Sequence, residues 1–347
     1  MIDLMRGNLL DADADALVNT VNCVGVMGKG IALQFKQAFP GNYKVYERAC
    51  RAGEVEVGRM LVVPMLGEHP RFIINFPTKR HWRGKSRLED IEAGLQALVG
   101  DVRRLGLKSV AVPPLGCGNG GLDWSEVRPR IERAFEALPG VEVLLFEPDG
   151  APVADEMRVR TKRPDMTPGR AILIAVMERY QGIGYRLTLL EIQKLAYLLQ
   201  RAGEQLKLNY VKDKYGPYAE NLNFVLQATE GHFTRGYGDR SRGAEIAVLP
   251  DGIQEASNFL QGHEESLHRL ERVSRLIEGF ETPHGMELIA TVDWAVHELG
   301  NTGRDLGQVV AAVHSWNERK RRIFGERAIG IAWERLSREG WVTSSAP

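Results

Sequence analysis

Three glycines at a dinucleotide-binding spacing lie in the segment PLGCGNGGLDW, residues 114–124. Gly116, Gly118 and Gly121 form the pattern G-x-G-x-x-G. Glycines at this spacing let the backbone approach a pyrophosphate closely, and a helix that follows offers its free N–H groups to the same anion. The segment therefore indicates a site for a phosphorylated ligand.

A second glycine-rich segment, NTVNCVGVMGKGIALQF, places Gly25, Gly28 and Gly30 between an expected strand and an expected helix. Either segment by itself could be no more than a tight turn. Two segments of one design, each at the carboxyl end of a strand and each leading into a helix, favour a pair of loops that hold one diphosphate from both sides.

A nicotinamide-dependent dehydrogenase is disfavoured, although the first pattern matches its fingerprint. That fingerprint follows the first strand of its domain, whereas here it precedes the last strand of the α/β region. The acid for the ribose hydroxyls should lie about 20 residues further on, and the candidate, Glu147, is at the end of the region. Helical sequence then stands where a second βαβ half would be needed.

The elements that must position these loops alternate through the first 150 residues. In the segment 87–106, apolar residues recur every three or four positions, as in an amphipathic helix. Strands alternating with helices predict a three-layer α/β fold around a mostly parallel sheet. We expect strands at 15–22, 58–66, 71–77, 108–115 and 141–148, and helices at 30–40, 87–106 and 123–138.

The composition changes near residue 150, where Pro, Gly and charged residues gather. This change predicts a first domain at 1–153, a linker at 154–168 and a second domain at 169–347. The second domain is expected to be mainly α. Its expected helices lie at 188–203, 264–280, 285–300 and 327–342, the last with a strand-like tail, and Thr188 and Glu191 have capping-box spacing.

Composition limits the class of protein. The 347 residues include 45 Lys+Arg and 45 Asp+Glu, so the net charge is zero, which excludes a broadly basic nucleic-acid coat but allows a local basic patch. Three cysteines without C-x-x-C spacing indicate a reducing compartment and argue against a disulfide framework or a zinc site. The acidic N-terminus is unlike a signal peptide. We expect a cytoplasmic protein without metal or cofactor.

Residues 7–40 and 113–124 resemble the macrodomain, an ADP-ribose-binding fold. They resemble most the branch of lysine-dependent ADP-ribosyl glycohydrolases, whose motifs G-x-M-G-x-G-I-A-x-x-F and P-x-x-G-C-G occur here at 25–35 and 113–118. The resemblance covers residues 1 to about 150. It implies that the two loops surround the diphosphate and distal ribose, with ADP-ribose contacts from Asn8, Leu9, Asn22, Gly25, Met27, Gly28, Gly30, Ile31, Pro113, Leu115, Gly116, Cys117, Gly118, Asn119 and Gly120.

The same resemblance implies that Lys79, in NFPTKRHWRGK, is the catalytic residue. Taken alone, it would be one more exposed lysine at a strand end. A neutral lysine amine can attack the anomeric carbon of the distal ribose, whereas the charged form cannot. Burial, or a nearby cation such as Arg80, would lower the pKa of Lys79 and free its lone pair.

Two positions depart from the motifs of the lysine-dependent branch. Its acidic residue after G-C-G aligns here with Gly120, while Asp123 lies further on, where we expect it to cap a helix. The usual adenine-contacting aspartate after the first glycine is replaced by Asn8, which can accept a hydrogen bond but carries no charge. Asn22 could face the distal ribose or form an Asx turn, and these two alternatives remain open.

A basic run begins at the expected catalytic lysine. Residues 79–87 contain five basic residues, a histidine and a tryptophan, and no acid. Such runs are commonly solvated loops, but phosphates bind cations, and unstacked bases stack on an indole. Its place beside Lys79 favours DNA contacts from Arg80, His81, Trp82, Arg83 and Lys85.

Over its whole length the chain resembles the DarG-type antitoxins of DarT/DarG toxin–antitoxin systems, through the macrodomain motifs and the segments 187–206 and 215–233. The resemblance implies a glycohydrolase that removes ADP-ribose from thymidine in single-stranded DNA. It also implies that residues 169–347 bind the cognate DarT-type toxin, a DNA ADP-ribosyltransferase. The alternatives are a non-catalytic ADP-ribose reader, a glycohydrolase acting on protein carboxylates, and a purely structural antitoxin.

Overall fold

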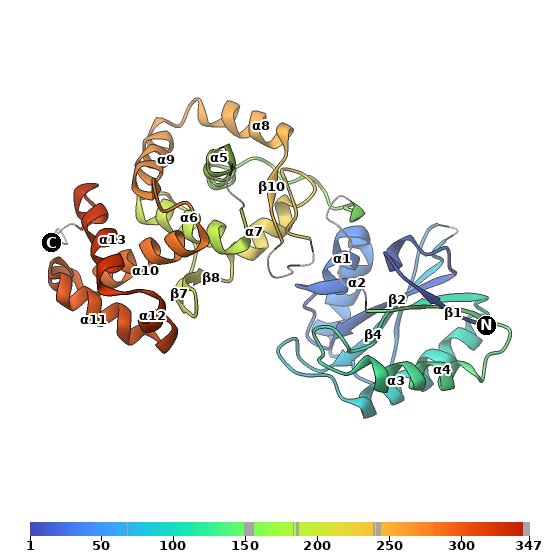
Figure 1. Cartoon of the computed structure of the whole chain (residues 1–347). Helices are drawn as coiled ribbons and strands as arrows, with labels where there is room; N and C mark the ends of the chain where they lie inside the picture. The colour runs from blue at the N-terminus through green and yellow to red at the C-terminus, as the bar shows by residue number, and fades with distance from the viewer. Residues whose placement is uncertain are drawn as a thin grey trace. The chain divides into compact units, whose positions relative to one another are not determined.

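The computed structural model describes residues 1–67, 69–148, 156–182, 184, 187–238, 240 and 244–342. The chain divides into two compact units after Lys162 (Figure 1). The α/β unit comprises Met1–Lys162 and Gly238–Ser241, and the helical unit comprises Arg163–Tyr237 and Arg242–Pro347.

The α/β unit is built on a six-stranded sheet with the order β1-β6-β5-β2-β4-β3. All neighbouring strands are parallel except β3, which pairs antiparallel with β4. This arrangement confirms the predicted mostly parallel α/β fold. The strands are β1 Ile2–Met5, β2 Ala16–Asn22, β3 Leu61–Pro64, β4 Phe72–Lys79, β5 Ser109–Val112 and β6 Glu142–Phe146.

Helices cover both faces of this sheet, with α1 and α2 on one side and α3 and α4 on the other (Figure 1). Successive residues of a strand point to opposite faces, so Val18 packs against the α3 and α4 layer, whereas Leu17 packs toward α1. Both are fully buried. The covering helices are η1 Leu9–Asp11, α1 Gly30–Ala38, α2 Pro40–Arg51, α3 Leu88–Arg104 and α4 Trp124–Phe135.

Three buried asparagines join the strands that carry the first glycine loop. The Asn19 amide on β2 donates to Asn75 Oδ1 on β4 at 2.9 Å, and Asn75 in turn donates to Asn42 Oδ1 on α2 at 2.7 Å. Buried amides must find partners, so this network fixes β2, β4 and α2 relative to one another beneath the loop.

The residues between the two units make contacts within the unit to which each belongs. Arg158 forms an ion pair with Asp11 at 2.6 Å, and the Arg160 amide donates to Gln37 O at 2.9 Å, both inside the α/β unit. Arg163 forms an ion pair with Glu255 at 2.7 Å, inside the helical unit.

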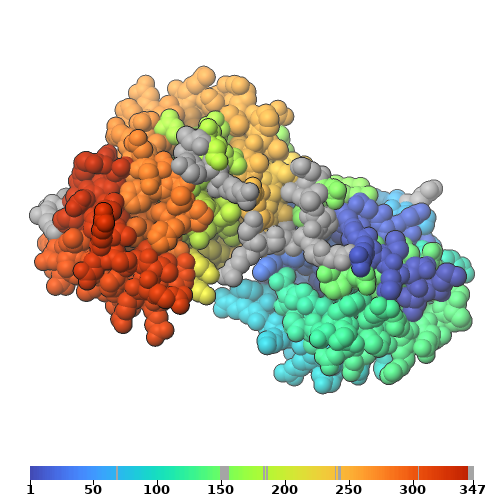
Figure 2. Space-filling model, viewed as in Figure 1, coloured from blue at the N-terminus to red at the C-terminus, as the bar shows by residue number. Residues whose placement is uncertain are grey.

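The helical unit contains most of its residues in helices. Helix α6 begins with the capping box predicted from Thr188 and Glu191. Residues 339–342 after the last helix form no strand, and the rest of the strand-like tail expected at the end of the chain lies outside the described residues. Figure 2 shows the later helices, coloured orange to red, packed together. The elements are α5 Pro168–Gly182, α6 Leu189–Arg201, β7 Tyr210–Asp213, β8 Gly216–Ala219, α7 Leu222–Thr229, β9 Thr234–Arg235, β10 Ala247–Val248, α8 Pro250–Leu260, α9 Glu264–Ile277, α10 Pro283–Leu299, η3 Gly300–Arg304, α11 Leu306–Trp316, α12 Glu318–Ile323 and α13 Glu326–Arg338.

A buried ionic cluster lies in the core of the helical unit. Lys320 Nζ donates to Glu287 at 2.5 Å and to Thr291 Oγ1 at 2.9 Å, while Arg319 binds the same carboxylate. Lys194 Nζ donates to Pro217 O at 2.7 Å on the β7–β8 hairpin. Because a buried charge is costly unless it is paired, Glu287 stabilises the burial of Lys320, and the Lys194 bond joins α6 to the hairpin.

No helix in the part of the chain that the structure describes is long and apolar enough to cross a membrane.

Candidate functional site

The candidate site lies where three parallel strands end. Strand β2 pairs with β4 on one side and with β5 on the other, and both pairings are parallel. Their carboxyl ends therefore meet at one edge of the sheet, which is where ligands of open α/β folds bind. This edge carries Asn22 at the end of β2, Lys79 at the end of β4, and the glycine-rich segment after β5.

The first loop, residues 23–29, is organised around Asn22. The Asn22 amide donates to Val26 O at 2.6 Å, and its Oδ1 accepts from the Val24 amide at 3.0 Å. Tyr46 on α2 donates its hydroxyl proton to Asn22 O at 2.7 Å. Of the two alternatives for Asn22, these contacts favour the Asx turn that stabilises the loop. Gly25 and Gly30 have φ values of +79° and +62°, which glycine adopts without strain.

The second loop, residues 113–122, packs tightly on the segment after β4. A Cβ at Gly120 would lie 2.3 Å from both Gly116 O and Ser86 Oγ. The Ser86 amide donates to Gly120 O at 3.0 Å, which ties the two segments together. There is no room for a side chain at Gly120, which gives a physical reason why this chain lacks the acid of the lysine-dependent branch there.

Gly28 and Gly118 differ from Gly120 because each has space around it. A Cβ at Gly118 would meet nothing within 4 Å, and one at Gly28 would meet only Val26 Cγ1 at 3.5 Å. Neither has a positive φ. The fold itself therefore does not require glycine at these two positions.

Asn119 connects the two loops and the candidate catalytic lysine. Lys79 Nζ donates to Asn119 O at 3.0 Å. A Cβ at Gly30 would lie 2.8 Å from Asn119 Nδ2. Asn119 therefore lies where the second loop meets the end of β4 and the start of α1. Two loops that hold one ligand must lie close together in this way.

The surroundings of Lys79 lower the pKa of its amine. Burial lowers the pKa of the Lys79 amine, and the like charge of Lys29 on the first loop lowers it further. Among the residues that the structure describes, no carboxylate forms an ion pair with Lys79 that would hold it charged. A lowered pKa increases the fraction of the amine that is neutral and therefore able to act as a nucleophile.

Arg80 was expected to lower the pKa of Lys79, but it is bound to a carboxylate instead. Its guanidinium binds the Asp90 carboxylate on α3 through two hydrogen bonds, of 2.6 and 3.0 Å. The charge that lowers the pKa of Lys79 comes instead from Lys29, a residue that was not predicted to belong to the site. It occupies the second of the two variable positions of the G-x-M-G-x-G motif.

The basic run after Lys79 forms an exposed surface with an aromatic residue in it. Trp82 is 40% exposed, and its ring stacks with that of His81 at 5.6 Å between centroids. The Arg83 guanidinium lies 4.5 Å from the centre of the Trp82 ring. Lys85 is exposed. Arg80 differs from these residues because both of its terminal nitrogens are engaged by Asp90.

The other expected ADP-ribose contacts fall into two groups. Pro113, Leu115, Leu9 and Met27 are buried. Ile31 and Cys117 are half-buried, and burial raises the pKa of the Cys117 thiol to about 11. Asn8 caps η1, accepting from the Leu10 amide at 3.1 Å and donating to Asp11 at 2.9 Å, so its side chain is already engaged.

Asp123 caps α4, as predicted. Its carboxylate accepts from the Ser125 amide at 2.8 Å and from the Ser125 hydroxyl at 2.7 Å, and these bonds lower the pKa of Asp123. It is therefore a structural carboxylate that stays ionised, which is the wrong state for a general acid.

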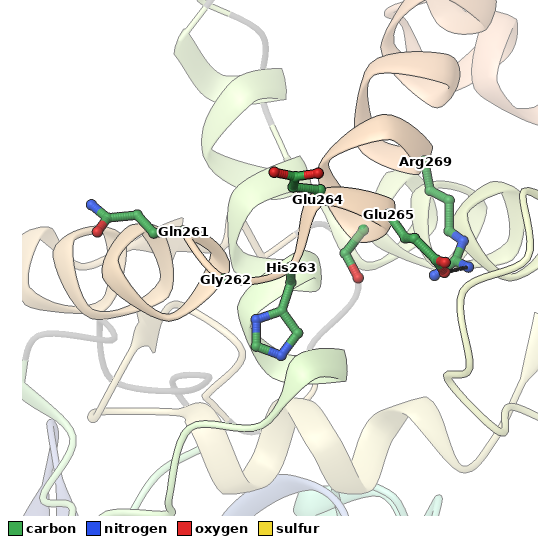
Figure 3. A pocket seen from close by; sticks show the side chains of 7 residues that line it. Gln261, Gly262, His263, Glu264, Glu265 and Arg269 are labelled. Atoms are coloured by element: carbon green, nitrogen blue, oxygen red, sulfur yellow. Dashed lines mark hydrogen bonds and ion pairs between the residues drawn. The ribbon is translucent and has the colours of Figure 1, made fainter.

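A separate hollow of about 460 Å³ lies in the helical unit, at the turn between α8 and α9 (Figure 3). Its lining includes His263, Glu264 and Arg269, and it contains none of the predicted site residues. Arg269 is held by Glu265 at 2.7 Å, as the dashed line in Figure 3 marks. No group of three metal-binding side chains occurs there or elsewhere in the described ranges.

Comparisons with known proteins match both units of the chain. The Macro domain family model matches residues 18–131. The DNA ADP-ribosyl glycohydrolase of Thermus aquaticus is 46% identical over 343 residues, covering 98% of this chain and 94% of that protein. A DNA ADP-ribosyl transferase–DNA ADP-ribosyl glycohydrolase fusion protein of Thermosipho africanus is 39% identical over 153 residues, covering 40% of this chain and 39% of the fusion. A solved structure, the macrodomain of Mycobacterium tuberculosis DarG, is 55% identical and covers 43% of this chain and 99% of that one, with a TM-score of 0.43.

Proposed function

Because this chain belongs to the family of DNA ADP-ribosyl glycohydrolases, the DarG antitoxins, we propose that it removes ADP-ribose from thymidine bases of single-stranded DNA through its macrodomain. The observation that carries this proposal is the position of Lys79. Its amine lies at the junction of the two glycine loops, 3.0 Å from Asn119 O, and burial lowers its pKa.

Lys79 acts as the nucleophile in the proposed reaction. Its Nζ lone pair forms a bond to the anomeric carbon of the distal ribose, and the bond from that carbon to the thymine nitrogen breaks. The bonding electrons leave with the base, which takes up a proton from solvent. Water then hydrolyses the ribose–lysine adduct, which releases ADP-ribose and regenerates the amine.

The absence of a general acid at position 120 is compatible with ADP-ribosylated thymidine as the substrate. Gly120 has no room for the carboxylate of the lysine-dependent branch, and Asp123 is engaged as a helix cap. A thymine N3 anion is a better leaving group than a simple alkoxide, so it needs less help from an acid. The exposed surface of His81, Trp82, Arg83 and Lys85 suits the rest of a DNA substrate, since it offers charge for phosphates and an aromatic ring for an unstacked base.

The helical unit is proposed to bind the cognate DarT-type toxin. The relative that matches nearly the whole chain supports a role for both units. The fusion relative supports a functional link between a DNA ADP-ribosyltransferase and this kind of glycohydrolase. Protection would then follow two routes, the reversal of the lesion and the restraint of the enzyme that makes it.

A comparison of two substrates tests the proposed activity. The protein is incubated with an oligonucleotide that carries ADP-ribosylated thymidine, and in parallel with a protein that carries ADP-ribose on carboxylates. We expect release of ADP-ribose from the oligonucleotide, faster than from the protein. Faster release from the protein would reassign the enzyme to carboxylate targets, and binding of ADP-ribose without release from either would make it a reader.

A further inference from the structure

The segment 80–86, which directly follows the candidate nucleophile, is tied to both glycine loops. At its start, the Cys23 amide of the first loop donates to Arg80 O at 3.2 Å. At its end, the Ser86 amide donates to Gly120 O of the second loop at 3.0 Å. Because both of its ends are fixed in this way, the residues between them are held beside the site.

The middle of this segment, residues 81–84, is a turn that organises its own side chains. The Gly84 amide donates to His81 O at 2.9 Å and closes the turn, while the Arg83 amide donates to His81 Nδ1 at 3.3 Å. The His81 ring stacks on the Trp82 ring, with 5.6 Å between centroids and 28° between planes. The Arg83 guanidinium lies 4.5 Å from the centre of the same indole. The turn therefore assembles three planar groups through contacts of its own.

This stack is accessible to a ligand, and its charge suits a polyanion. Although both neighbours pack on it, Trp82 is still 40% exposed. The run 79–87 contains no acid, and Arg83 and Lys85 are exposed. A single strand of nucleic acid offers what this surface lacks, namely phosphates for the cations and bases whose faces stack on aromatic rings and guanidinium groups.

We propose that the turn 81–84 is a preformed stacking site for a nucleobase that neighbours the modified thymidine in the same DNA strand. The proposal rests on the proposed function, in which the modified thymine is held over Lys79 by its bond to the distal ribose. A neighbouring base has no such bond, and it extends the stack at Trp82. Because the turn is already ordered by its own contacts, little of the stacking energy is lost in forming the site. The turn is thus a specificity-determining element that favours DNA strands over modified proteins.

Two oligonucleotides of equal length test this proposal. Each carries one ADP-ribosylated thymidine, but in one of them the neighbouring nucleotides are abasic, so that the phosphates are kept and the bases are removed. Their affinities are measured by fluorescence anisotropy with the full chain carrying Lys79→Ala, so that the ligand is not consumed. The measurement is repeated after adding Trp82→Ala or Trp82→Phe. Phe224→Ala is the matched control, because it removes an aromatic ring that is 64% exposed on α7, in the other unit.

We expect the protein that retains Trp82 to bind the base-bearing oligonucleotide at least about fivefold more tightly than the abasic one. Trp82→Ala should abolish this difference. It should leave the affinity for the abasic oligonucleotide and its dependence on salt unchanged, because no charge is removed. Trp82→Phe should keep most of the difference, since it keeps a ring, and Phe224→Ala should keep all of it.

Equal affinity of the Trp82-containing protein for both oligonucleotides would overturn the proposal. A Trp82→Ala variant that loses affinity for both oligonucleotides alike would also overturn it, and would assign the indole to the structure of the turn. Failure of the proposed function would show differently: the protein with Lys79 intact would leave ADP-ribose on the oligonucleotide, whereas the comparison of affinities does not depend on hydrolysis.

Discussion

Gly120→Ala should open the second glycine loop and slow hydrolysis. The added Cβ would lie 2.3 Å from the Gly116 carbonyl oxygen and from Ser86 Oγ, and contacts below 3.0 Å are essentially never found for real Cβ atoms. Gly116 O is a backbone atom that already accepts from the Leu122 amide at 3.1 Å, so it cannot move without breaking that bond. Overpacking of this kind costs about 2 kcal/mol.

Hydrogen–deuterium exchange on the full chain measures this cost where it arises. The Ser86 amide is bonded to Gly120 O and the Leu122 amide to Gly116 O, so both report on the opening of the loop. A cost of about 2 kcal/mol corresponds to exchange about 30-fold faster at these amides. Turnover should fall as well, because Asn119 O moves with the loop and no longer orients Lys79.

Gly118→Ala is the matched control two residues away. Nothing lies within 4 Å of a Cβ at that position, and its φ is not positive, so exchange at Ser86 and Leu122 should be unchanged. Exchange in the Gly120→Ala variant that equals the wild type would refute the packing argument. The absence of the family acid at Gly120 would then need another explanation.

Three further predictions concern the ligand and the partner. Gly28→Glu should leave the fold intact but weaken ADP-ribose binding by at least about tenfold in calorimetry, because it places a negative charge beside a diphosphate; equal affinity would remove the first loop from the site. Replacing Arg83, Lys85 and Arg87 with Gln should lower the affinity for modified DNA and make that affinity less dependent on salt, while the affinity for free ADP-ribose stays the same. The control substitutions are at Arg103 and Arg104, at the end of α3, and an unchanged salt dependence would show that the basic run at 79–87 does not contact DNA. Residues 1–162 should fold alone and hydrolyse the modified oligonucleotide, since the contacts of Arg158 and Arg160 are internal to that unit, and residues 163–347 should capture the toxin in a pull-down. A folded helical unit that captures no toxin would contradict the proposed roles of the two units.

The parts of the fold that the sequence predicted are those that depend on local pattern. Strand β2, its glycine loop and α1 are continuous in the chain, so periodicity and glycine spacing identify them together. Strand β1 was not predicted, because four residues with no alternation of burial give no signal. Helix α2 was not predicted either, because Pro40 was interpreted only as the end of α1, whereas it also begins α2.

The parts of the site that the sequence did not predict depend on contacts between distant residues. The proximity of Gly30, the neighbour of Lys29, to the Asn119 side chain was not predicted, because the two residues are about 90 positions apart in the chain. Arg80 was expected to act on Lys79 because the two are adjacent, but Asp90 on α3 binds its guanidinium. The sequence indicated the charge of Arg80, but only the fold determined that it faces Asp90.

The central claim is that the Lys79 amine, held at the junction of the two loops, performs the reaction. The most direct measurement is turnover of an ADP-ribosylated thymidine oligonucleotide by the Lys79→Ala variant, with ADP-ribose affinity measured by calorimetry on the same sample. The account predicts a loss of hydrolysis by orders of magnitude with ADP-ribose affinity within a few-fold of the wild type, because a covalent group is removed while both loops remain. Near wild-type turnover in a variant that still binds ADP-ribose would contradict it.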